Sequence, residues 1–214
     1  MYLQMQLQRS SFSVSTLQYN SVNRQFVISS QRVARCARVH TASSIRAADL
    51  TATKQKLKEA CRTKKTPPDQ VLQYLREVES ASKTSSQVQN FPGILNGTWR
   101  LVFAVPAPMP VWAYIPVIED AIIDVTKQTI ELRSFLGPAT FTFSGTASFI
   151  SSPENNVYDM NFSFNASEIA IFGKSWKGQR EPKQKTYSFF LAEDELAAVN
   201  SRATGGKTLM TRHQ

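Results

Sequence analysis

The chain has 214 residues, of which 42% are hydrophobic and 19% charged. This composition suits a folded domain with extensions and excludes a fully disordered polypeptide. Its formal net charge of +9 would indicate nucleic acid or an anionic surface as a partner if it were spread over the folded part. The sequence contains no apolar run of about 18 residues, so no transmembrane segment is expected.

The first 48 residues differ in composition from the rest of the chain. They contain six arginines and many serines but no Asp, Glu or Lys. This composition is typical of a plastid or mitochondrial transit peptide, and the segment has no apolar core of the kind found in secretory signals. We therefore predict a transit peptide over residues 1–48, cleaved between Cys36 and Ala48, with a disordered N-terminal tail as the alternative.

Removal of this segment changes the charge and the reactive side chains that are left. The charge falls from +9 to about +3, because six arginines leave and all sixteen acidic residues follow Ala48, so nucleic acid is not expected as a partner. Cys61 and His213 would be the remaining cysteine and histidine, too few for a disulfide or a zinc site. We expect no metal, no cofactor and no catalytic residue.

Residues 49–90 have the patterns of two helices and a linker. Asp49 can cap a helix from Leu50 to Lys64. Thr66 can cap a second helix with Pro67 at its first position. The polar segment from Ser80 to Gln89 is predicted to be a linker. The apolar residues of the second helix fall at helical spacing: Val71, Leu72, Leu75 and Val78.

From residue 91 to residue 214 the chain is predicted to be mainly β. In the segment from Asn96 to Val105, Trp99, Leu101, Phe103 and Val105 alternate with Thr98, Arg100, Val102 and Ala104, the period of two that a strand with one well-buried face shows. The pattern recurs later, whereas residues 174–185 are polar. About eight or nine short antiparallel strands without intervening helices favour an up-and-down β-barrel, preceded by the two short α-helices.

A barrel of about eight strands is either filled by its own side chains or holds one small ligand. Gly145 and Ala147 lie on the apolar face of their strand, and they indicate either tapered packing or room for a guest. The sequence leaves both alternatives open. The large residues expected to line the interior are Phe103, Phe141, Phe143, Phe149, Met160, Phe162, Phe164, Tyr187 and Phe189.

The segment from Val105 to Ile118 combines four prolines with large apolar residues. The prolines exclude a helix and withhold hydrogen-bond donors, so Met109, Trp112 and Tyr114 would be displayed on a loop. Trp and Tyr favour the interface between water and lipid. We predict that this loop is a portal that contacts a lipid surface, with a lid packed over the barrel as the alternative.

Four segments carry a resemblance to a known family. They are NGTWRLVF at the start of the β region, IEDAIID, FTFSGTASF, and the final block FFLAEDELAAVNSRATGGKTLMTR. From Leu95 to Arg212 the chain is similar to the plastid-lipid-associated proteins, or fibrillins. The acidic turn at 193–195, Arg202 and Gly205–Gly206 match the family's ending, whereas Asn200–Ala203 departs from its usual small residue, Arg and Gly.

The resemblance implies a lipocalin-like barrel in the plastid, at plastoglobules or thylakoids or in the stroma. Such a protein would bind or sequester a small hydrophobic molecule, namely a carotenoid, a quinone or a fatty acyl lipid. Most family members have no demonstrated catalysis. The G-x-W at Gly97–Trp99 also resembles the opening of lipocalin-type barrels, in which a late arginine lies against the indole, and Arg202 and Arg212 are the candidates for that arginine.

Three functional classes stay open. The first is a carrier that takes one lipophilic molecule, and the second is a coat protein with a filled barrel that adsorbs to plastid lipid surfaces. The third is an enzyme acting on a lipophilic substrate. Glu119, Asp120 and Asp124 could supply an acid and a base for it, although solvation at strand ends is the favoured interpretation. The basic stretch from Lys174 to Lys185 contacts anionic lipid or is a solvated loop.

Overall fold

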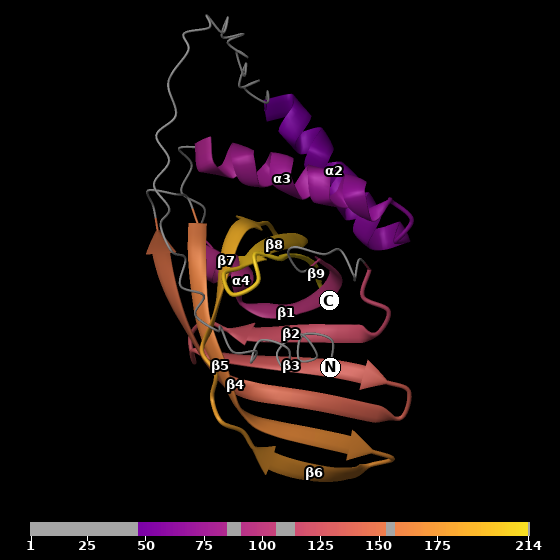
Figure 1. Cartoon of the computed structure of the whole chain (residues 1–214), viewed down its shortest axis with the longest axis vertical. Coiled ribbons are helices and arrows are strands. Elements are labelled where there is room, and N and C mark those ends of the chain that lie inside the picture. Colours follow the sequence, from indigo (N-terminus) through magenta and orange to yellow (C-terminus); the bar gives the residue numbers. More distant parts are fainter. Residues whose placement is uncertain (1–46, 85–90, 106–113, 153–156, 214) are drawn as a thin grey trace, which may run out of the picture. The chain divides into compact units, whose positions relative to one another are not determined.

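Figure 1 shows the chain as a computed structural model, which describes residues 47–84, 91–105, 114–152 and 157–213. The predicted mainly β class, with two short helices ahead of antiparallel strands, is confirmed. The transit peptide predicted for residues 1–48 lies outside the described residues, except for Ala47 and Ala48. The elements are α2 (Ala47–Thr63), α3 (Pro68–Thr84), α4 (Phe91–Leu95), β1 (Gly97–Val105), β2 (Ile118–Asp124), β3 (Thr129–Leu136), β4 (Ala139–Ser152), β5 (Val157–Ile171), β6 (Lys174–Gln179), β7 (Lys185–Ala192), β8 (Leu196–Ser201) and β9 (Lys207–Arg212).

The ends of α2 and α3 follow from local backbone chemistry. Lys64 adopts a left-handed conformation, with φ at 53°, and its N–H donates to the carbonyl of Ala60 at 2.9 Å, which closes α2. The carbonyl of Pro67 accepts the first hydrogen bonds of α3, from Gln70 and Val71 at 3.0 and 3.1 Å. Pro68, not Pro67, therefore occupies the first helical position, where a missing N–H is harmless.

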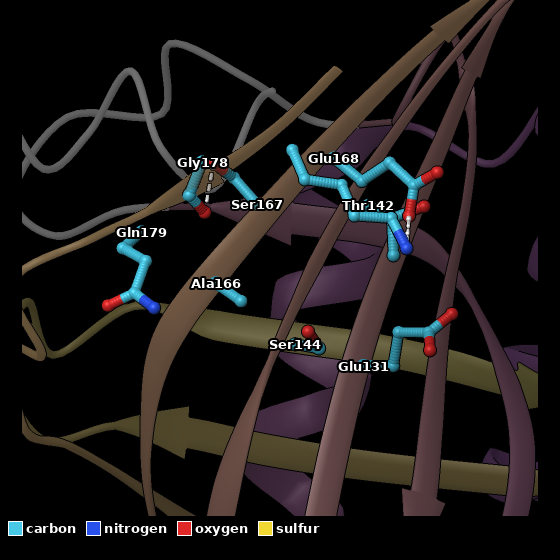
Figure 2. A pocket seen from close by; sticks show the side chains of 9 residues that line it. Glu131, Thr142, Ser144, Ala166, Ser167, Glu168, Gly178 and Gln179 are labelled. Atoms are coloured by element: carbon cyan, nitrogen blue, oxygen red, sulfur yellow. Dashed lines mark hydrogen bonds and ion pairs between the residues drawn. The ribbon is translucent and has the colours of Figure 1, made fainter. Parts of the chain in front are cut away.

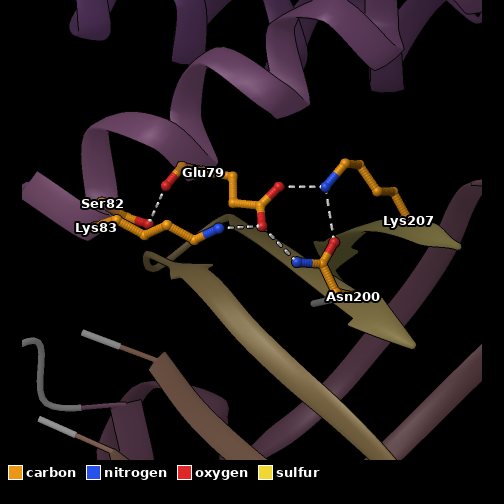
Figure 3. A network of polar contacts seen from close by, with 5 residues as sticks. All are labelled: Glu79, Ser82, Lys83, Asn200 and Lys207. Atoms are coloured by element: carbon orange, nitrogen blue, oxygen red, sulfur yellow. Dashed lines mark hydrogen bonds and ion pairs between the residues drawn. The ribbon is translucent and has the colours of Figure 1, made fainter. Parts of the chain in front are cut away.

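Helix α3 continues into the segment predicted to be a linker. Figure 3 shows the polar contacts around Glu79 that accompany this extension. The Glu79 carboxylate accepts hydrogen bonds from Lys83 and from the Asn200 amide, each at 2.9 Å, and pairs with Lys207. Ser82 donates to the Glu79 carbonyl at 2.9 Å. The linker prediction is wrong for residues 80–84, because contacts with β8 and β9 hold the last turn of the helix.

The strands pair in the order β4-β3-β2-β1-β9-β8-β7-β5-β6, and β4 also pairs with β5. Each of the strands β1 to β5 and β7 to β9 thus pairs with two neighbours among them, so that together they form a ring-like sheet. Strand β6 is attached to this sheet through β5 (Figure 1). Strand β5 pairs with β7 over its first half and with β6 over its second half. The polar residues 174–179, for which no strand was predicted, form β6.

Register shifts in three strand pairs decide which side chains face inside the ring. Directly paired residues in antiparallel strands share a face, so one extra residue reverses the faces beyond it. In β1, Leu101 pairs with Met210 and Phe103 pairs with Leu209. Leu101 therefore faces inside and Phe103 faces the helices. The prediction that Phe103 lines the interior is wrong, because apolar alternation does not reveal a bulge.

An apolar layer joins α2 and α3 to the outer face of β1, β7, β8 and β9. Leu57 and Leu75 of the helices and Phe103 of the sheet are fully buried in it. A large part of the core therefore lies between the helices and the sheet. The buried members of this layer are Leu57, Ala60, Cys61, Val71, Leu75, Val78, Val102, Phe103, Val105, Phe190, Leu191, Leu196, Ala198 and Leu209.

Gly145 lies where β5 approaches β4 most closely. A Cβ atom added at Gly145 would lie 1.8 Å from the backbone carbonyl oxygen of Ser163, so no larger residue fits without a backbone shift. The register of β4 against β5 also shifts at this point. The small residue at 145 therefore reflects close backbone packing, and the space beside it is not free for a guest.

Candidate functional site

The inner face of the sheet carries a row of aromatic rings in contact. The ring centroids of Phe143 and Phe164 are 6.2 Å apart, those of Phe164 and Phe162 are 5.5 Å apart, and those of Phe162 and Tyr187 are 4.9 Å apart. The last two pairs meet edge to face, the arrangement that the charge distribution of aromatic rings favours. We call these four residues the aromatic row.

The register places the other predicted interior residues, apart from Phe103, on the same face as the aromatic row. The β4–β5 pairing places Phe141 and Phe149 on this face, and the β5–β7 pairing places Met160 and Phe189 there. Met160 and Phe189 are buried, whereas Phe141 and Phe149 are half-buried. The inner face is therefore apolar over β4, β5 and β7.

Trp99 and Arg212 are directly paired between β1 and β9, and their side chains are in contact. Trp99 is 0% exposed, and its indole N–H donates to the carbonyl of Leu95 at 2.8 Å. The guanidinium carbon of Arg212 lies 4.5 Å from the Trp99 ring centroid, a cation–π distance. Arg212 also donates to the carbonyl of Asp194 at 2.7 Å and to that of Asn96 at 3.0 Å. Of the two candidate arginines, Arg212 is the one that lies against the indole.

Arg202 lies elsewhere, on the outer face of β5 and β7. It pairs with the Asp159 carboxylate and donates to the Ser188 hydroxyl at 3.0 Å. Ser188 in turn donates to Asp159 at 2.6 Å. The prediction that Arg202 could close the barrel against Trp99 is therefore wrong, and Arg202 fixes a buried aspartate on the outside of the sheet.

A carboxyl group is buried on the inner face. Glu119 is 0% exposed and accepts a hydrogen bond from the Ser134 hydroxyl at 3.0 Å. Burial raises the pKa of Glu119. Burial also raises the pKa of Tyr187, with a smaller contribution from the Glu119 charge. The interpretation of Glu119 as a solvated strand end is wrong, because it shares a face with the buried Ala121 two positions further along β2.

Asp120 and Asp124 are on the opposite face of β2 from Glu119. Asp120 forms a two-point ion pair with Arg100, at 2.8 and 3.0 Å. Asp124 pairs with Lys127 at 3.1 Å. Because the sheet separates them from Glu119, these aspartates do not form an acid and base pair with it. Glu119 was named from the sequence as a candidate acid or base, but its burial was not predicted, although its place two residues before the apolar Ala121 was the available signal.

The inner face becomes exposed where β5 pairs with β6. Phe141, Ile169 and Trp176 are directly paired across three strands, and Trp176 is 57% exposed. Phe172, in the turn that follows β5, is 83% exposed and has a left-handed φ of 48°. The exposed apolar residues at this end are Leu136, Ile169, Ile171, Phe172 and Trp176, which we call the apolar tip.

The basic stretch forms β6 and the approach to β7. Lys177 is on the outer face of β6 and lies 3.8 Å from the Glu168 carboxylate. The guanidinium carbon of Arg180 lies 5.1 Å from the Phe143 ring centroid. Lys185 is directly paired with Phe162. Arg180 and Lys185 thus lie against the aromatic row, a placement that their sequence pattern did not reveal.

The predicted portal is described in part. Met109 and Trp112 lie outside the described residues. The Tyr114 ring meets the Phe103 ring edge to face, with centroids 5.5 Å apart, and its hydroxyl donates to the Thr66 carbonyl at 2.8 Å. Tyr114 is therefore half-buried against the layer between the helices and the sheet.

A polar groove of about 420 Å³ lies on the outer face of β3 to β6 (Figure 2). Its charged side chains have partners: Glu168 is beside Lys177, and Glu131 pairs with Arg133. The groove offers hydroxyl and amide groups without an uncompensated charge. It is lined by Glu131, Thr142, Ser144, Ala166, Ser167, Glu168, Lys177, Gly178 and Gln179.

The other reactive groups point to no further chemistry. Burial raises the pKa of the Cys61 thiol to about 12, which keeps it protonated and unreactive. Among the described residues, acidic, cysteine and histidine side chains form no cluster that could hold a metal ion. No helix in the described part of the chain has both the length and the apolar composition that a membrane span requires.

Fold and site together define a mainly β protein, with antiparallel strands in a ring-like sheet whose inner face is largely apolar and aromatic. Comparison of the chain with protein-family models, with curated proteins and with solved structures gave no match.

Proposed function

We propose that this chain belongs to the plastid-lipid-associated (fibrillin) family. In this proposal the ring-like sheet is a lipocalin-like barrel that holds one small hydrophobic molecule, namely a carotenoid, a quinone or a fatty acyl lipid. Residues 1–48 direct import into the plastid, where the protein contacts plastoglobules or thylakoids. The segments that resemble the family support this assignment, since they form β1, β2, most of β4 and the chain from β7 to β9, with Trp99 of β1 against Arg212 of β9.

One observation carries the lipid-binding proposal. The apolar inner face runs without a break from the buried aromatic row to the exposed apolar tip. On β4, Phe143 is buried, and Phe141, two residues away on the same face, is half-buried and directly paired with Ile169. Ile169 is in turn paired with Trp176. A lipophilic molecule could move along these apolar side chains from a lipid surface to the aromatic row, beside which Arg180 and Lys185 lie.

The apolar tip is the proposed contact with the lipid surface. Exposed apolar area is unfavourable in water by about 25 cal/mol per Å², and contiguous exposed apolar residues commonly mark interaction sites. Lys174 is paired with Ile171 at the tip and would add attraction to anionic lipid. These properties favour a peripheral lipid contact through Phe172 and Trp176.

Native mass spectrometry with organic extraction tests the carrier function. The full chain, isolated from plastids, is expected to carry one lipophilic molecule per protein. A protein that is consistently empty would contradict the carrier proposal. It would favour the coat protein, for which the close contacts within the aromatic row and the filled space beside Gly145 are the supporting observations.

Liposome flotation tests the lipid contact. Replacing both Phe172 and Trp176 by serine is expected to reduce flotation, because both side chains are exposed and apolar. Ile150→Ser is the matched control, since Ile150 is also exposed but is paired with Asp159 on the outer face. Equal flotation of the double variant and the control variant would contradict a contact through the apolar tip.

A further inference from the structure

The link between β6 and β7 lies beside the aromatic row. Along β5, the pairing with β7 ends at Phe162, and the pairing with β6 begins at Ala166. Phe164 lies between these two pairings, and the backbone N–H of Arg180 donates to the Asn165 carbonyl at 2.9 Å. Residues 180–184, which are not in a strand, therefore pass close to an aromatic ring of the inner face.

Two cationic side chains lie against the aromatic row at this point. The Arg180 guanidinium lies over the Phe143 ring. Lys185 is paired with Phe162 and, like Tyr187 two residues later, is on the inner face of β7. Its side chain is half-buried. Lys183, which is exposed, lies near enough for its charge to act on Lys185.

The cations of this group are held by no ion pair among the described residues. No carboxylate in the described part of the chain forms an ion pair with Arg180, Lys183 or Lys185. Burial, with smaller contributions from the Arg180 and Lys183 charges, lowers the pKa of Lys185 to about 8. A half-buried ammonium group beside two other cations is unfavourable for folding, and an anion placed among them would relieve it.

We infer that Arg180 and Lys185 bind the carboxylate of a single-chain lipophilic acid whose apolar chain lies along Phe143, Phe164 and Phe162. This inference rests on the proposed function and narrows it, because it selects an acid among the possible hydrophobic ligands. An arginine offers a two-point hydrogen bond to a carboxylate, and a lysine adds a compact charge. The aromatic rings supply the apolar surface for the chain.

Matched ligands that differ in the head group provide the test. Lauric acid and lauryl alcohol have the same apolar chain, and their affinities for the full chain are measured below micelle concentrations and without vesicles. The acid is expected to bind about tenfold more tightly than the alcohol, as for one charge-assisted contact. If the acid binds only after vesicles are added, the cations contact a membrane surface, and the inference is overturned.

Variants at the two cations locate the head group. Arg180→Gln and Lys185→Gln are each expected to remove most of the preference for the acid while leaving the affinity for the alcohol within about twofold. Lys177→Gln, on the outer face of β6, is the control and is expected to keep the preference. Thermal unfolding checks that each variant is folded. Lys185→Gln is expected to cause no loss of stability, because it removes a positive charge that lies beside the cations Arg180 and Lys183.

The possible failures are distinguishable. Equal affinities for acid and alcohol in the wild-type protein, or an unchanged preference in Lys185→Gln, would overturn the inference and leave the lipid-binding proposal standing. Absence of binding for both ligands would overturn the lipid-binding proposal together with the inference.

Discussion

The two sides of the sheet use apolar residues in different ways. Where α2 and α3 cover β1 and β7 to β9, the large apolar side chains are buried between the helices and the strands. Where β5 pairs with β6, side chains of similar size, such as Trp176 and Phe172, remain exposed. The covered side therefore contributes to folding stability, whereas the uncovered end leaves apolar surface exposed, and this surface is the proposed lipid contact.

The largest expected effect is on the covered side. Phe103→Ala is expected to lower the free energy of unfolding by about 3–5 kcal/mol, because it removes a fully buried ring and leaves a cavity. Urea unfolding measures the change. Ile150→Ala, at an exposed apolar position, is the control and is expected to change stability by about 0.5 kcal/mol or less. Similar losses in the two variants would remove the contrast between covered and uncovered residues.

The close approach of β4 and β5 is the next point to test. Gly145→Ala is expected to destabilise the protein by about 2–3 kcal/mol, because the new methyl group would meet the backbone carbonyl of Ser163. Gly178→Ala, whose Cβ would lie 3.3 Å from the Ser167 hydroxyl, is the control with a small expected effect. A tolerated alanine at 145 would show that β5 can move away from β4.

The apolar alternation of the sequence predicted the covered and central strands, because one face of each is buried. It did not predict β6, whose residues are all exposed and so carry no burial pattern. Bulges are also invisible to alternation, and for that reason Phe103 was assigned to the wrong face. Trp99 and its two candidate arginines were found from motif resemblance, but the choice of Arg212 required the strand register.

The residues of the candidate site also divide into those that the apolar alternation predicted and those that it did not. Most aromatic residues of the inner face were predicted, since large apolar residues at alternate positions share a face. The burial of Glu119 and the placement of Arg180 and Lys185 on the inner face were not predicted, because charged residues near strand ends usually face water. Their placement depends on which strands pair and where the pairing of β5 passes from β7 to β6.

The link between α3 and the sheet is expected to depend on pH. Burial raises the pKa of Glu79, but the hydrogen bonds from Lys207 and Lys83 outweigh this, so the pKa is lowered from 4.5. A lowered pKa in the folded state contributes stability above the unfolded value, and this contribution is lost as the pH falls through the folded value. Glu79→Gln is expected to cost about 1 kcal/mol at pH 7.

Urea unfolding of the wild-type protein and of Glu79→Gln between pH 7 and pH 3 measures this effect. The two proteins are expected to converge in stability as the pH falls through the folded pKa of Glu79, which lies below its ordinary value. A difference that persists unchanged at the lowest pH would contradict an ionic origin. Glu131→Gln, at an exposed pair on β3, is the control with little expected change at any pH.

The smallest expected effect is at the apolar tip. Phe172 has a left-handed backbone, which is unfavourable for a residue with a Cβ atom by about 1 kcal/mol. Phe172→Gly is therefore expected to raise the free energy of unfolding by up to about 1 kcal/mol, measured by urea unfolding, while reducing liposome flotation. A decrease in stability would show that the Phe172 ring contributes to folding, contrary to its exposure.

The pairing of β1 with β9 also bears on how the protein folds. The two strands are distant in sequence, and Arg212 and Asn96, which are in contact, are 116 positions apart. Contacts at such separations slow folding, because a long chain must be ordered before they form. During synthesis, the edge of β1 that pairs with β9 stays unpaired until β9 has been made. In that interval the nascent chain is expected to be most prone to aggregation.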